Sequence, residues 1–79
     1  MARIRVKKLV IAFAATTQAM KMEACAKAAG AAGRIIPLPP VIDAGCGLAW
    51  CAPPEARSEL MQLLQKEKIQ AAGIHELLL

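Results

Sequence analysis

An unbroken apolar run near the start of the chain most constrains the fold. Residues 7–15 include Leu9, Val10, Ile11 and Phe13, and no polar residue alternates with them after Lys8. A strand with one face in water alternates apolar and polar side chains, whereas a strand covered on both faces does not. The run therefore predicts a strand at the centre of a sheet, around which the other elements must pack.

The segment that follows predicts a helix over residues 17–29. Ala, Met, Lys and Gln dominate it, and all of these residues favour helices. Thr16 or Thr17 offers an N-cap hydroxyl, and Gly30 is suited to the C-cap. An i, i+4 spacing predicts a narrow apolar stripe made of Met20, Ala24 and Ala28.

The second half of the chain repeats strand and helix signals. Residues 34–38 predict a strand at a sheet edge, because Pro37 and Pro39 lack amide donors. Residues 40–45 predict a loop, and a third strand runs from 46 or 47 to 52. A helix from Pro53 to about residue 68 is predicted from the amphipathic spacing of Ala56, Leu60, Leu63 and Leu64. Residues 74–78 predict a last strand.

This order predicts a ferredoxin-like βαββαβ sandwich of the α+β class. Its four-stranded antiparallel sheet would carry two helices on one face, and the other face would be open to a second copy. We expect residues 1–6 to form a basic N-terminal arm and residues 7–79 a single ferredoxin-like domain, since 79 residues suit one domain.

Composition argues against two classes of partner. The net charge is only +4, and the chain has one Trp, one Phe and no Tyr, so it lacks the stacking residues of a nucleic-acid-binding surface. The apolar run after Lys8 is shorter than the ~20 residues of a membrane-spanning helix.

Basic residues followed by this run also resemble a secretory signal, but its cleavage would remove the best strand. A cytoplasmic location is the favoured interpretation.

The three cysteines provide the candidate chemistry. Their odd number gives no disulfide framework and favours free thiols in a reducing compartment. In an extended strand Cys46 and Cys51 would lie ~16 Å apart on opposite faces, so they could neither bridge nor share a metal. No metal site or cofactor is predicted.

Cys46 is the candidate nucleophile, because Gly45 and Gly47 give it little steric cover. The alternative is that Cys46 has no chemical role and is present because a small residue fits a tight loop. Cys25 and Cys51 are expected to be small packed residues, with a role as a second thiol left open. His75 has no ligand partner close in sequence and is expected to be a polar side chain on the last strand.

Two motifs resemble the family called putative Se/S carrier protein-like, a small domain found in many anaerobic bacteria. Residues 33–39, G-R-I-I-P-L-P, are similar to the family's G-R-L-I-P-x-P run, and residues 46–49, C-G-L-A, to its S-C-G-[IL]-A motif. Similarity also extends to Phe13, Thr16 or Thr17, Ala19, Glu23 and the Gly73-Ile74 region. This chain departs from the family at Pro40 and Trp50, where arginines are usual, and at residues 43–45, where serines are usual.

The resemblance implies that Cys46 accepts a sulfane sulfur or selenium atom and passes it on as a persulfide or perselenide. Gly45 and Gly47 would support it through access and loop amides, and Arg34 through its charge if the second strand brings it near. The partners would be a protein donor and a protein acceptor, with a homodimer also expected, and a relay of this kind needs no substrate pocket. Two alternatives stay open, a non-catalytic dimerising or regulatory module and a soft-metal chaperone.

Overall fold

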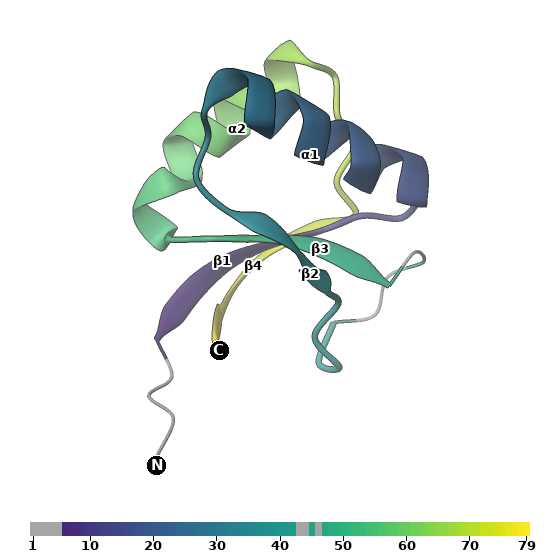
Figure 1. The fold of residues 1–79 in the computed structure, drawn as a ribbon. Coiled ribbons are helices and arrows are strands. Elements are labelled where there is room, and N and C mark those ends of the chain that lie inside the picture. Colours follow the sequence, from purple (N-terminus) through teal and green to yellow (C-terminus); the bar gives the residue numbers. More distant parts are fainter. Residues whose placement is uncertain (1–5, 43–44, 46) are drawn as a thin grey trace.

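The structure is a computed structural model that describes residues 6–42, 45 and 47–79. The chain is an α+β protein with a four-stranded antiparallel sheet in the order β2-β3-β1-β4. Figure 1 shows both helices on one face of this sheet. Along the chain the elements are β1 (Lys7–Ala12), α1 (Thr16–Ala29), β2 (Arg34–Pro37), β3 (Leu48–Ala52), the 3-10 turn η1 (Pro54–Ala56), α2 (Arg57–Lys66) and β4 (Gly73–Leu78).

Strand β1 lies inside the sheet, between β3 and β4, as the unbroken apolar run predicts. Leu9, Val10 and Ile11 are all fully buried, so both faces of the strand are covered. Phe13 follows the strand and is also fully buried in the core beneath the helices. Val6 extends the ladder, because its amide and carbonyl both hydrogen-bond to Leu79. Residues 1–5 of the expected basic arm lie outside the described residues.

Strand β2 is at the edge of the sheet, as its prolines predict. It pairs with β3 from Arg34 opposite Cys51 to Pro37 opposite Leu48. Beyond Pro37, the amide of Leu38 donates to the carbonyl of Gly47 at 2.9 Å. This bond continues the pairing past the proline that cannot donate.

The prediction of which face of α1 is buried is wrong, because the helix is rotated about its axis relative to the predicted orientation. The buried residues are Ala19, Met22 and Ala26, whereas Met20 is 64% exposed. A helix rich in alanine has several faces of similar apolarity, so the face is chosen by the one large side chain that fits against the sheet, which is Met22. The predicted N-cap hydroxyl is also wrong, since Ala15 is the N-cap, whereas the predicted C-cap at Gly30 is confirmed by its φ of 68°.

The second helical segment agrees with its predicted spacing. Ala56 lies in η1, Leu60, Leu63 and Leu64 lie in α2, and all four are buried. They share one core with the side chains that the sheet presents to the helices, among them Phe13 and Trp50. This packing fixes both helices over the same face of the sheet.

The opposite face is less open than we expect from the sequence. Val10, Ala12 and Ala49 are buried there together with Ile42, and Ile36, Leu38, Leu77 and Leu79 pack against them. The segment after β2 supplies two members of this second cluster. Part of the face without helices is therefore closed by the chain itself.

Candidate functional site

Gly45, which precedes Cys46, lies where the β2–β3 connection approaches the start of α1. A Cβ atom on Gly45 would come within 2.7 Å of the carbonyl oxygen of Ala14, so a larger residue would collide with the backbone there. Gly47 has a φ of 72° in open space, which glycine adopts without strain. Cys46 itself lies outside the described residues.

The adjacent end of α1 is electropositive. Its N-cap, Ala15, makes no side-chain capping bond, and the first turn contains no acidic residue. Amides in the first turn of a helix have no carbonyl partner inside the helix, and the helix dipole adds partial positive charge at this end. Because Gly45 packs on Ala14, the connection that carries the candidate thiol is anchored one residue before this N-cap.

Arg34 lies elsewhere. The β2–β3 register sets it opposite Cys51, whereas Gly47 is beyond the Pro37–Leu48 pair at the other end of the ladder. Three residues of strand separate the two ends, a distance of ~10 Å. The structure therefore brings Arg34 together with Cys51 and not with the glycine pair.

Cys25 and Cys51 are both free and half-buried. Cys51 lines a hollow of about 270 Å³ together with Lys8, Gly33, Arg34, Ala52 and Pro53. Cys25 lines a second hollow, formed by residues of α1 and α2, which also contains Lys66 and Glu67. The two thiols thus have similar exposure but different charges around them.

Trp50 takes the place at which the resemblance leads us to expect an arginine, and its role is structural. Its side chain is 3% exposed and its indole N–H donates to the carbonyl of Ala32 at 3.1 Å. Gly33 lies directly against the ring, with a φ of 120°. Sequence reasoning identified the lost cation here but not this contact, because the pairing of Trp50 with the segment before β2 depends on the tertiary fold.

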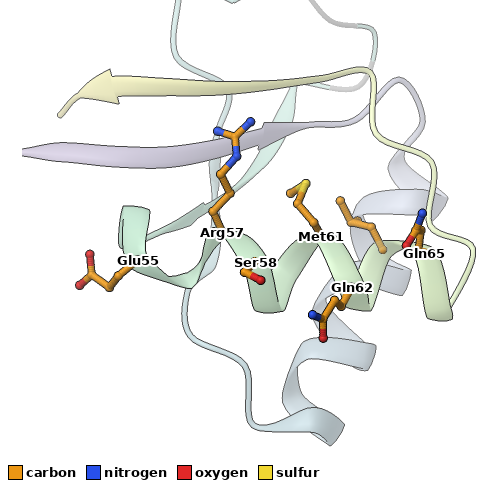
Figure 2. Close-up of a pocket in the computed structure, with 7 residues that line it drawn as sticks. Glu55, Arg57, Ser58, Met61, Gln62 and Gln65 are labelled. Atoms are coloured by element: carbon orange, nitrogen blue, oxygen red, sulfur yellow. The ribbon is translucent and has the colours of Figure 1, made fainter.

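A surface groove runs along α2 and is lined by Glu55, Arg57, Ser58, Met61, Gln62, Leu64 and Gln65. Arg57 forms an exposed ion pair with Glu76 of β4 at 3.4 Å. Figure 2 shows that Arg57 and Met61 point toward the strands, that Gln62 points away from them and that Glu55 projects to the side. The polar groups of the groove do not converge on one point, so it lacks the arrangement of a catalytic site.

Among residues 6–42, 45 and 47–79, no three His, Cys, Asp or Glu side chains are grouped so that they could hold a metal ion. In the same part of the chain, no helix has the length and apolarity needed to cross a membrane.

These features define a small α+β protein whose candidate chemistry is that of cysteine thiols. The family model described as putative Se/S carrier protein-like matches residues 8–76 of the 79-residue chain. The chain therefore belongs to this family, as its two motifs predict. No curated protein matches the chain. No solved structure matches it either.

Proposed function

We propose that this protein carries sulfur or selenium between a donor protein and an acceptor protein, bound to Cys46. The family match carries the proposal, because it covers residues 8–76 and so includes the C-G-L-A motif that begins at Cys46. We further propose that the work takes place in the cytoplasm, where thiols stay reduced.

The proposed step needs no oxidant or reductant. The Cys46 thiolate attacks the outer sulfur of a donor persulfide, R–S–SH, and a new sulfur–sulfur bond forms as the donor's bond breaks. The donor leaves as R–S⁻ and Cys46 becomes a persulfide, from which an acceptor thiolate removes the outer sulfur in the same way. A selenium atom follows an equivalent course through Cys46–S–SeH.

The surroundings of the two glycines support this use of Cys46. Gly47 has open space around it, so a protein donor meets little obstruction there. The α1 N-terminus beyond Ala14 offers positive charge, which favours a thiolate over a thiol. A transfer between proteins needs no enclosed substrate site, and the groove along α2 lacks converging polar groups.

The ferredoxin-like class is the finer description that we propose for the fold. Its support is the order βαββαβ along the chain, with β1 and β2 on either side of β3 and β4 outside β1. In such a split βαβ arrangement the β2–β3 connection and the β1–α1 junction lie at the same end of the sheet. The contact of Gly45 with Ala14 agrees with that arrangement.

The test is to incubate the protein with a cysteine desulfurase or a selenocysteine lyase and its substrate, and then to measure its intact mass. We expect a gain equal to one sulfur or one selenium atom, removed by reductant and abolished by Cys46→Ser. Cys25→Ser is the matched control and should load normally. No gain, or a gain that peptide mapping of the loaded wild-type chain places on a thiol other than Cys46, would refute carriage by Cys46.

A dimerising module is the second candidate, and the outer edge of β4 favours it. Within the described residues no strand pairs with that edge, and Ile74 and Leu78 are 36% and 63% exposed on it. Unpaired apolar edges are sites at which a second strand adds. Under this alternative, sedimentation should find a dimer that is unchanged by replacement of all three cysteines with serine.

A further inference from the structure

We propose that Cys51, together with Arg34 and Lys8, forms a second thiol site that reacts preferentially with anionic sulfur compounds. The site lies on the sheet face opposite the helices, away from the glycine pair. Its natural role rests on the proposed function, because a carrier is the kind of protein that meets such compounds. Its selectivity follows from charge alone and can be tested whether or not Cys46 carries sulfur.

The sheet register brings the three side chains to one face. Arg34 and Val10 are the residues opposite Cys51 on its two neighbouring strands. Opposite residues of antiparallel strands point to the same face with Cβ atoms ~5 Å apart. Val10 belongs to the cluster on the face without helices, so Cys51 and Arg34 share that face. Lys8, two residues before Val10, is a diagonal neighbour of Cys51 at ~7 Å.

The hollow between these residues is shaped to admit a small group. Gly33, Ala52 and Pro53 complete its lining, and its volume is about 270 Å³. Gly33 contributes no side chain, and Trp50 cannot enter because its ring is held in the core by the bond to Ala32. The thiol is therefore reached through a gap bordered by two cationic side chains.

In the part of the chain that the structure describes, no carboxylate lies within ion-pair distance of either cation. Within the described residues, Arg34 and Lys8 form no ion pair, and the hollow has no acidic lining residue. The hollow of Cys25 instead contains Lys66 beside Glu67, whose charges oppose each other. An approaching anion is therefore attracted at Cys51, whereas the hollow of Cys25 is lined by charges of both signs.

The matching natural reactant is a persulfide that bears a negatively charged group close to its sulfur atoms. The Cys51 thiolate, whose proton has gone to solvent, attacks the outer sulfur of R–S–SH. The new bond gives Cys51–S–SH, and the donor leaves as R–S⁻ with the electron pair of the broken bond. Arg34 and Lys8 attract the anionic group of the donor and hold it beside the thiolate.

Two methanethiosulfonate reagents of similar size and opposite charge test this proposal. The sulfonatoethyl reagent is an anion and the trimethylammonioethyl reagent a cation, and a thiolate displaces methanesulfinate from either. Each is reacted with the full chain carrying Cys25→Ser and Cys46→Ser, which keeps Cys51, or Cys46→Ser and Cys51→Ser, which keeps Cys25. We expect the anion-to-cation rate ratio to be on the order of tenfold higher at Cys51.

Four changes separate the role of charge from simple access. Arg34→Ala and Lys8→Ala should each lower the ratio at Cys51, Arg34→Lys should retain it, and salt at 1 M should reduce it because the Debye length falls to ~3 Å. Arg34 is exposed and Lys8 is half-buried, so circular dichroism should show an unchanged fold. An equal ratio at Cys51 and Cys25, or a ratio unaffected by both alanine variants, would overturn the proposal.

Discussion

The indole N–H of Trp50 donates to the carbonyl of Ala32, and the same ring lies against the next residue, Gly33. A Cβ atom built on Gly33 would collide with the ring and would lie 2.7 Å from the carbonyl oxygen of Cys51. The backbone there also has a φ of 120°, which L side chains rarely adopt. One glycine thus allows the start of β2 to close over a buried tryptophan.

Gly33→Ala should therefore destabilise the protein strongly. We expect a loss of about 3 kcal/mol in the free energy of unfolding, from backbone strain together with a collision in a packed core. Gly30→Ala is the matched control, because Gly30 also has a positive φ of 68° but open space around it. Its cost should be about 1 kcal/mol. Urea unfolding measures both, and equal losses would contradict a role for the Trp50 contact.

Trp50→Phe tests the other partner of this contact. The change removes the donor to Ala32 and leaves a partly buried carbonyl without it, at a cost of about 1–3 kcal/mol. It also removes the Nε1 atom that lies closest to Gly33. The double variant Gly33→Ala/Trp50→Phe should then be less destabilised than the sum of the single variants. Additive losses would show that the two residues do not share one contact.

The rotation of α1 gives a prediction that separates two similar methionines. Met22 is fully buried against the core, whereas Met20 is 64% exposed. Met22→Ala should lower the free energy of unfolding by about 2–4 kcal/mol. Met20→Ala should change it by less than about 0.5 kcal/mol. Thermal or urea unfolding of both variants provides the measurement, and the reverse order would restore the stripe predicted from sequence.

These two methionines also show how far the sequence predicts the fold. Spacing identified the face of α2, because its large leucines at 60, 63 and 64 leave one choice, and all three are buried. It failed for α1, where alanines on several faces make the rotation depend on the fit of one side chain. The predicted C-cap at Gly30 is confirmed, because this glycine has a positive φ at the end of the helix.

The candidate site also has features that the sequence predicts and features that it does not. The cysteine between two glycines is visible in the sequence, and so is the family motif that contains it. The pairing of Arg34 with Cys51 was not predictable, because it requires the register of β2 on β3. Spacing along one strand cannot indicate which cation a neighbouring strand supplies. The contact of Gly45 with Ala14 was not predictable for the same reason, because the two residues are distant in the chain.

Gly45→Ala is the change that tests this last contact against the proposed carrier role. A Cβ atom there would lie 2.7 Å from the carbonyl oxygen of Ala14, so the connection must move away from the start of α1. Under the proposed function, movement of this connection away from the positive end of α1 should slow sulfur or selenium loading by about tenfold. The free energy of unfolding should fall by no more than about 1 kcal/mol, because loop substitutions outside the core cost little.

Gly47→Ala is the matched control, because it meets no atom within 4 Å and adds only the strain of a φ of 72°. Loading is followed by intact mass against time, and equal rates for the two variants would separate the Ala14 contact from the reactivity of Cys46.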